Sequence, residues 1–298
     1  MDLFNIYKDK NTDLFNCTKK MAQMMENKSQ LLENINSHDR DKHIKFQENG
    51  HVYYVKREKG FKSVTTLVHD AFEKFNANKI IDNMMKSPNW PKNKYYGKTK
   101  EEIKALWKEN GQEAAKMGTA MHAMFEFYYN NIKPEVIESY VGTKEHEYFM
   151  NFVRDHEALK PYRTEWNVYH EDYKIAGSID MIFMNEDGTL SIYDWKRCKA
   201  IEKFNGFGKS CLVKGLNHIS DTNYWHYTFQ LNIYKFILET KYGFQVKDLH
   251  LVVIHPENSF NNYEKIQLPF IQNDVKKLLD SHLMKTKSNI QNYFTKKE

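Results

Sequence analysis

Gly177-Ser178-Ile179-Asp180 and Asp194-Trp195-Lys196 are the two stretches that decide the fold of this chain. Each aspartate lies in an apolar, alternating segment, Ile175–Met184 or Leu190–Lys196, and this pattern predicts a strand. The five residues between these segments read Asn-Glu-Asp-Gly-Thr, which is typical of a tight turn, so the two strands are predicted to form a hairpin. The aspartate and lysine of the second stretch are two residues apart and should share one face.

Asp180 has apolar neighbours on both sides, in Ile179-Asp180-Met181-Ile182-Phe183. A carboxylate in a buried strand carries a large desolvation cost unless it is paired or bound to a metal. Two readings remain open: a structural ion pair with Lys196, or a divalent cation held between the acids of two adjacent strands. An acid pair with a lysine beside it suits phosphodiester hydrolysis assisted by a metal.

Composition sets broad limits on the class of protein. The 298 residues are 41% hydrophobic and 28% charged, with a formal net charge of +5, which permits a polyanionic partner without requiring one. We expect no membrane span and no secretory signal. The three scattered cysteines, Cys17, Cys198 and Cys211, predict a reducing, intracellular setting and no iron–sulfur cluster.

The order of predicted elements indicates an α/β fold with a central mixed sheet flanked by helices. We expect residues 1–110 to form a mostly helical region with one hairpin that packs on a core of residues 111–298. The predicted helices are Leu14–Ile35, a run after Ser63-Val64-Thr65-Thr66 to about Met85, Thr99–Lys108, Gln112–Asn130, Lys144–Leu159, Thr222–Thr240 and Asn273–Gln291. The other predicted strands are His43–Phe46, His51–Val55, Arg163–Tyr169 and Leu249–His255, and residues 201–222 are predicted to be irregular.

Two helices carry further candidate residues. His122 and Glu126 are one turn apart on the Gln112–Asn130 helix and share a face, as do Gln230 and Tyr234 on a later helix. An imidazole can add a nitrogen ligand to the acids, and an amide and a phenol can bond a phosphate or order the lysine. The alternatives for these four residues are a half-buried histidine, a solvated acid and an amphipathic packing face.

Together these residues resemble the RecB-like branch of the PD-(D/E)xK nuclease superfamily. Four motifs occur in the family's order: Gly118-Thr119-x-x-His122-x-x-x-Glu126, Gly177-Ser178-Ile179-Asp180, Asp194-Trp195-Lys196 and Gln230-x-x-x-Tyr234. Ser63-Val64-Thr65-Thr66 is similar to an element found upstream in some relatives. The fold that the resemblance implies is the restriction-endonuclease-like core.

The resemblance also implies roles for individual residues. His122, Asp180 and Asp194 match metal ligands, with the Trp195 backbone carbonyl completing the set, and Lys196 matches the catalytic lysine. Gln230 and Tyr234 match the motif that shapes the DNA channel, Glu126 matches a frequent acidic partner, and Glu165 is a further acid that recurs. Ser178, Arg197 and Lys199 are candidates for substrate contact, the last two within a basic, aromatic segment that suits a single strand.

The implied function is hydrolysis of DNA by a nuclease that depends on Mg²⁺ or Mn²⁺, most simply an exonuclease acting on DNA ends or single strands. A separate helicase is a candidate partner, because the chain has no phosphate-binding Gly-x-x-x-x-Gly-Lys loop of its own. A structure-specific endonuclease and a non-catalytic nucleic-acid-binding protein on a nuclease fold are the alternatives. Strand preference, cleavage polarity and oligomeric state stay undetermined by the sequence.

Overall fold

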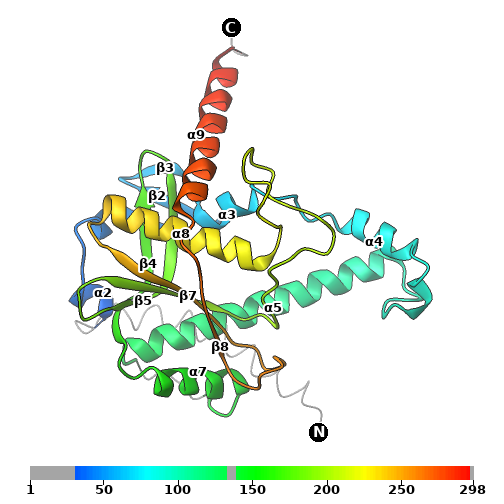
Figure 1. The fold of residues 1–298 in the computed structure, drawn as a ribbon, viewed down its shortest axis with the longest axis horizontal. Coiled ribbons are helices and arrows are strands. Elements are labelled where there is room, and N and C mark those ends of the chain that lie inside the picture. Colours follow the sequence, from blue (N-terminus) through cyan, green and yellow to red (C-terminus); the bar gives the residue numbers. More distant parts are fainter. Residues whose placement is uncertain (1–30, 133–138, 296–298) are drawn as a thin grey trace.

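A mixed β-sheet with helices on both faces forms the body of the protein (Figure 1). The computed structural model describes residues 31–132 and 139–295. The sheet order is β1-β2-β3-β5-β6-β7-β8, with β4 pairing with β5 beside this path. Pairing is parallel for β3 with β5 and for β6 with β7, and antiparallel elsewhere. The strands are β1 (Ile44–Gln47), β2 (Val52–Val55), β3 (Glu58–Ser63), β4 (Lys160–His170), β5 (Ile175–Met184), β6 (Leu190–Lys196), β7 (Val246–Val253) and β8 (Glu264–Gln267).

The helices pack in two layers around β5 and β6, which contribute side chains to both apolar clusters of the core. In one cluster α3 and α8 cover the sheet, with the start of α9, and in the other α5 and α7 cover it. The described helices are α2 (Leu32–Ile35), α3 (Val64–His69), α4 (Ala77–Met85), α5 (Lys100–Tyr129), α7 (Lys144–Asp155), α8 (Asn223–Lys241) and α9 (Gln272–Thr295). None of these helices is long and apolar enough to cross a bilayer. The predicted α/β fold with a mixed central sheet is confirmed.

Several predicted boundaries are wrong. The helices predicted at 99–108 and 112–130 are one continuous helix, α5, that passes through Gly111 and Gly118. Glycine costs only about 1 kcal/mol in a helix and keeps its backbone donor, which proline lacks, so neither glycine is enough to end the helix. The run predicted from Thr66 to Met85 is instead two helices, α3 and α4, separated by residues 70–76. Strands β3 and β8 were not predicted, because their exposed residues are too polar to show an apolar alternation.

The N-terminal hairpin of β1 and β2 continues into β3, which joins the main sheet through a short parallel pairing with β5. Ser63 ends β3 and caps α3, since its hydroxyl accepts the backbone N–H of Thr66 at 3.0 Å. Helix α5 continues without a break through residues 110 and 111, where we expected residues 1–110 to end and the core of residues 111–298 to begin. This division of the chain stays a prediction. Of the helix predicted at 14–35, residues 14–30 lie outside the described residues.

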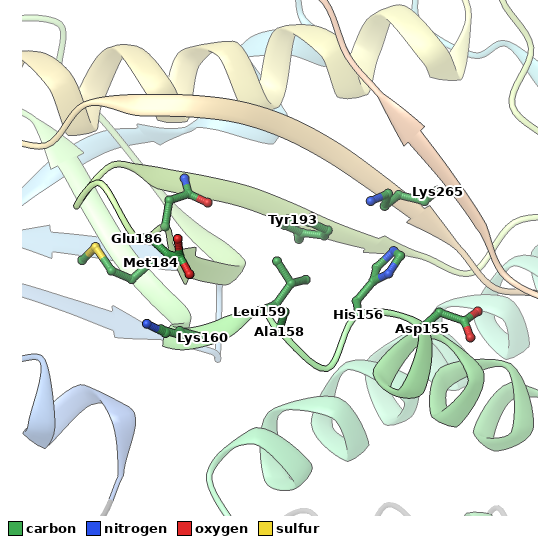
Figure 2. Close-up of a pocket in the computed structure, with 10 residues that line it drawn as sticks. Asp155, His156, Ala158, Leu159, Lys160, Met184, Glu186, Tyr193 and Lys265 are labelled. Atoms are coloured by element: carbon green, nitrogen blue, oxygen red, sulfur yellow. The ribbon is translucent and has the colours of Figure 1, made fainter.

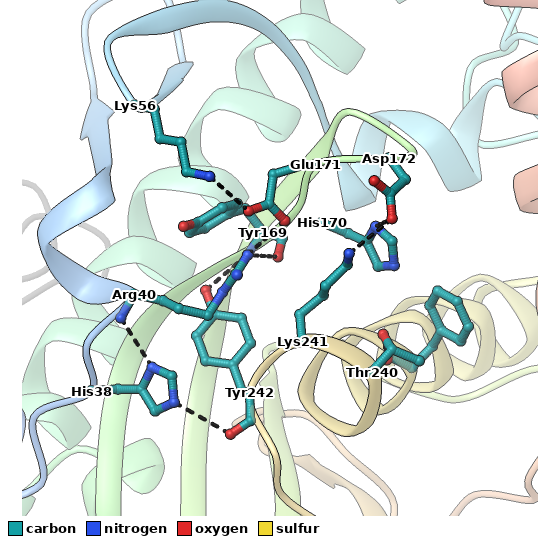
Figure 3. Close-up of polar contacts among 11 residues, drawn as sticks. His38, Arg40, Lys56, Tyr169, His170, Glu171, Asp172, Thr240, Lys241 and Tyr242 are labelled. Carbon is teal, nitrogen blue, oxygen red and sulfur yellow. Dashed lines mark hydrogen bonds and ion pairs between the residues drawn. The ribbon is translucent and has the colours of Figure 1, made fainter.

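The segment before β1 is fixed to the end of β4 by an arginine (Figure 3). The Arg40 guanidinium lies 4.0 Å from the ring centroid of Tyr169 and 4.8 Å from that of Tyr242. Its Nη2 forms an ion pair with Glu171 at 2.8 Å. Because this arginine bridges β4 and the end of α8, it helps to hold the strand that delivers Glu165 in place.

Candidate active site

A histidine and two acids converge where α5 crosses the β4–β5 pair. His122 Nδ1 lies 3.5 Å from Glu165 Oε1 and 3.6 Å from Asp180 Oδ2. One potential ligand atom from each residue lies within 4.8 Å of the other two. Two carboxylates and one imidazole are a donor set that fits a divalent cation such as Mg²⁺ or Mn²⁺. Among the described residues, this cluster is therefore a candidate metal centre.

The second ring nitrogen of His122 faces the backbone. Nε2 lies 2.9 Å from the carbonyl oxygen of Trp195 at the end of β6. If the proton is on Nε2, this nitrogen donates to the carbonyl and Nδ1 keeps its lone pair toward the acids. A metal-binding histidine commonly has its other N–H held in this way. The Trp195 carbonyl thus orients the imidazole in this arrangement.

Glu165 lies on β4, opposite Asp180 on β5, because Thr164 pairs with Met181 and Trp166 with Ile179. Its backbone φ is +43°, a left-handed conformation that costs a non-glycine residue about 1–3 kcal/mol. The hydroxyl of Ser178 donates to Glu165 Oε2 at 2.9 Å. The strained backbone and this hydrogen bond direct the Glu165 carboxylate toward His122.

Asp194 and Lys196 form a second buried group beside the cluster. Their side chains make a close ion pair, as the two-residue spacing along β6 predicted, and Asp194 is only 2% exposed. Gln230 Nε2 on α8 donates to Asp194 Oδ1 at 3.4 Å and to the Tyr234 hydroxyl at 3.5 Å. Asp194 does not belong to the three-residue cluster of possible ligand atoms.

The two groups are linked across the β5–β6 hairpin. The backbone N–H of Trp195 donates to Asp180 Oδ2 at 3.0 Å. This bond fixes the Asp180 carboxylate between His122 and the next strand. The polypeptide thus brings the predicted residues His122, Asp180, Asp194, Trp195 and Lys196 into one site, with Glu165 as an additional member.

Burial governs the protonation of this site. It raises the pKa of Asp180, and together with the charge of Asp180 it raises the pKa of Asp194 to about 7. Burial acts against protonation of His122, yet the charges of Asp180 and Glu165 outweigh it and raise the pKa of His122 to about 9. Burial likewise opposes the charge on Lys196, but the Asp194 and Asp180 carboxylates outweigh it and raise that pKa. A bound cation would offset the repulsion between these closely spaced carboxylates and the cost of burying their charge.

The other predicted site residues lie around this centre. Glu126 is on α5 one turn after His122, and burial, followed by the charge of Glu165, raises its pKa to about 8. The Arg197 guanidinium is occupied by the buried carboxylate of Glu145, at 2.9 Å from Nη2, and Lys199 forms an ion pair with Glu257. The contact of Arg197 and Lys199 with substrate stays a prediction.

A cleft of about 500 Å³ opens from Lys196 between α3 and the start of α8. Its lining includes His69, Asp221 and His226, none of which belongs to a predicted motif. His226 Nε2 lies 2.9 Å from Asp221 Oδ1. These residues belong to segments whose proximity depends on tertiary packing, and no motif spacing marks them. A ligand can therefore reach Lys196 through this cleft.

A second hollow, of about 380 Å³, lies elsewhere and contains none of the predicted site residues (Figure 2). The end of α7, the β5–β6 turn and β8 surround it. It is lined by Asp155, His156, Ala158, Leu159, Lys160, Met184, Asn185, Glu186, Tyr193 and Lys265. We assign it no role in the chemistry of the candidate site.

Comparison with known proteins places this chain in a family of nucleases. The model of the PD-(D/E)XK nuclease superfamily matches residues 63–297. The match spans most of the chain and includes every element that carries the candidate site, so the chain belongs to the PD-(D/E)XK nuclease superfamily. Membership of its RecB-like branch stays a prediction. No curated protein matches the chain.

Two solved structures are similar at low sequence identity. A candidate exonuclease from Eubacterium rectale aligns with a TM-score of 0.39 and 12% identity, over 58% of this chain and 66% of that one, just under two thirds of its length. The protein SSO0001 aligns with a TM-score of 0.31 and 14% identity, over 76% of this chain and 77% of that one.

Proposed function

We propose that this protein is a metal-dependent deoxyribonuclease of the RecB-like type, acting as an exonuclease on DNA ends or single strands. The observation that carries the proposal is the convergence of His122, Glu165 and Asp180 within 4.8 Å of one another, with the Asp194–Lys196 pair beside them. A divalent cation, Mg²⁺ or Mn²⁺, would supply the positive charge that stabilises negative charge developing on the attacked phosphate. Membership of the nuclease superfamily supplies the substrate class.

Three residues would hold the cation in this proposal: His122 through Nδ1, and Glu165 and Asp180 through one carboxylate oxygen each. Asp194 is the fourth candidate ligand, because its carboxylate adjoins the cluster on the neighbouring strand. The Trp195 carbonyl, first expected to be a ligand, fits better as the acceptor that orients His122. Glu126, one turn after His122 on α5, stays a candidate acidic partner of the site.

Lys196 faces both the acids and the cleft. Its ammonium pairs with Asp194 and lies 4.9 Å from the ring centroid of Tyr227. A positive group in this position stabilises the charge on a phosphate as water attacks the phosphorus and the bond to the leaving oxygen breaks. The Gln230 amide, bonded to both Asp194 and Tyr234, keeps the carboxylate from turning away. Substrate would approach through the cleft between α3 and α8.

The test is cleavage of end-labelled DNA by the purified protein with Mg²⁺ or Mn²⁺. We expect Lys196→Ala and Asp180→Asn each to lower the rate by about 100-fold or more, in line with the loss of a group that acts in the transition state. Lys59→Ala, which removes an exposed lysine on β3, is the matched control and should cut at the wild-type rate. Site variants that cleave as fast as this control would overturn the assignment.

Linear and circular single strands distinguish the exonuclease from the endonuclease alternative. An exonuclease requires a free end and leaves circular DNA intact, whereas a structure-specific endonuclease cuts it. Tight DNA binding without cleavage at any divalent cation would favour the non-catalytic alternative. The complete set of Asp180, Asp194 and Lys196 argues against that alternative, because a site that no longer catalyses would be expected to lose at least one of them.

A further inference from the structure

Helix α4 and the first half of α5 form an arm that projects from the body of the protein (Figure 1). Ile81 of α4 and Ile103 of α5 are fully buried, yet neither belongs to the two apolar clusters of the core. Lys100 and Asp82 join the two helices with an ion pair at 2.7 Å. The arm is therefore stabilised by contacts between its own two helices, and the end of the arm farthest from the body is not needed for packing of the core.

The tip is the connection between α4 and α5, residues 86–98, which contains four lysines and no acid. Its lysines, Lys86, Lys92, Lys94 and Lys98, are all exposed, and none forms an ion pair with any residue in the described ranges. By contrast, the lysines that flank the tip, Lys79 and Lys100, pair with Glu73 and Asp82. Asp82 and Glu102 lie close enough to feel the charges of Lys86 and Lys98, but they make no direct ion pair with them.

Aromatic rings accompany these lysines. The rings of Trp90 and Tyr96 meet edge to face with centroids 6.0 Å apart, and Tyr96 is 60% exposed. The Lys94 ammonium lies 4.9 Å from the ring of Tyr95. The positive charges of the tip lysines repel one another, and the exposed aromatic ring gains little from contact with water. A polyanion with flat rings of its own would neutralise the lysines and stack on the aromatic side chains.

We propose that this tip binds the backbone of the substrate nucleic acid at a distance from the scissile bond. The identity of the ligand rests on the proposed nuclease function, whereas the surface itself does not. His122 lies 22 residues after Lys100 on the same helix, so the tip is roughly 33 Å along α5 from the metal cluster. At a rise of about 3.4 Å per nucleotide step, this distance spans about ten steps of a stacked strand. Long substrates gain the contact and very short ones do not.

The experiment measures DNA binding by fluorescence anisotropy in EDTA, so that no hydrolysis is required. The tip variant is Lys92→Gln/Lys94→Gln/Lys98→Gln. The control is Lys45→Gln/Lys59→Gln/Lys160→Gln, which removes the same charge from exposed positions on β1, β3 and β4. On a 30-nucleotide strand we expect the tip variant to bind about ten times more weakly than the control, with a salt dependence shallower by about two counterions. On a 6-nucleotide strand the two variants should bind alike.

Equal affinity of the tip and control variants for the long strand would overturn the proposal, as would an equal loss on both lengths or no binding of DNA by the wild type. If the tip variant loses binding to vesicles containing phosphatidylserine and keeps binding to DNA, the partner is a membrane surface and the proposal is wrong. Failure of the proposed function is recognised separately: a protein that never cleaves DNA can still bind the long strand through the tip. Unchanged melting temperatures would show that both variants fold.

Discussion

A Cβ atom added to Gly177 would lie 2.7 Å from Cε1 and 2.8 Å from the hydroxyl oxygen of Tyr234. The glycine of the Gly177-Ser178-Ile179-Asp180 stretch is thus needed for its lack of a side chain, which makes room for a buried ring from α8. That ring supports Gln230, and Gln230 supports Asp194. A glycine in β5 in this way sets the position of an acid on β6.

Gly177→Ala is expected to force the Tyr234 ring out of its position. Overpacking of this kind costs about 1–3 kcal/mol of unfolding free energy, and the displaced ring would disturb the Gln230–Asp194 contact. We expect a lower midpoint in urea unfolding and a slower rate of DNA cleavage. Adding Tyr234→Leu should restore part of the stability lost in Gly177→Ala. If the two substitutions are strictly additive in unfolding free energy, the close approach does not govern this site.

Glu165→Gln should weaken binding of Mn²⁺ by at least about 10-fold, because the cluster loses one of its two carboxylates. Ser178→Ala should have a smaller effect in the same direction, since it removes only the hydroxyl that holds Glu165. Isothermal titration calorimetry with Mn²⁺ measures both changes. Glu157→Gln, an exposed acid just after α7, is the matched control. An affinity for Mn²⁺ in Glu165→Gln equal to that of the control would exclude Glu165 from the metal centre.

Removal of divalent cations should abolish cleavage and also lower thermal stability. A ligand that binds only the folded state at 100 times its dissociation constant adds about 2.7 kcal/mol to the unfolding free energy. We therefore expect Mn²⁺ to raise the melting temperature of the wild type in differential scanning fluorimetry, and EDTA to reverse the rise. In Asp180→Asn the rise should be much smaller. An equal rise in this variant would place the bound ion elsewhere.

The sequence was sufficient to predict the hairpin and the residues on it. Asp180, Asp194 and Lys196 stand out because acids and a lysine in apolar strands violate the usual preference for apolar side chains there. Glu165 does not stand out in this way, because polar residues such as Arg163, Thr164 and Asn167 surround it in a segment without a clear apolar alternation. Its importance depends on the pairing of β4 with β5 and on a local φ of +43°, which periodicity does not encode.

The cleft residues show the same limit at longer range. His226 and Asp221 approach one another across the start of α8, next to Phe72 from the connection that follows α3, whose ring centroid is 4.1 Å from that of His226. No spacing rule connects position 72 with position 226. Sequence patterns report which face of an element is apolar, whereas the contact of α8 with the segment after α3 depends on how the elements pack.

Acidification should destabilise the protein through buried His170, which is 3% exposed at the end of β4 (Figure 3). Burial, aided by the positive charge of Lys241, lowers its pKa from 6.5 to about 4. Between these values the unfolded chain takes up a proton that the folded chain does not, so the stability that is fully present above pH 6.5 is lost as the pH falls toward 4. The expected loss from this residue is about 1–3 kcal/mol.

His170→Phe, which keeps a ring against Phe236 (5.4 Å between centroids, 8° between planes), should flatten the pH dependence of urea unfolding across this window. The control, His43→Gln at an exposed position, should leave the slope unchanged, and a wild-type slope in His170→Phe would mean that other groups bind the proton.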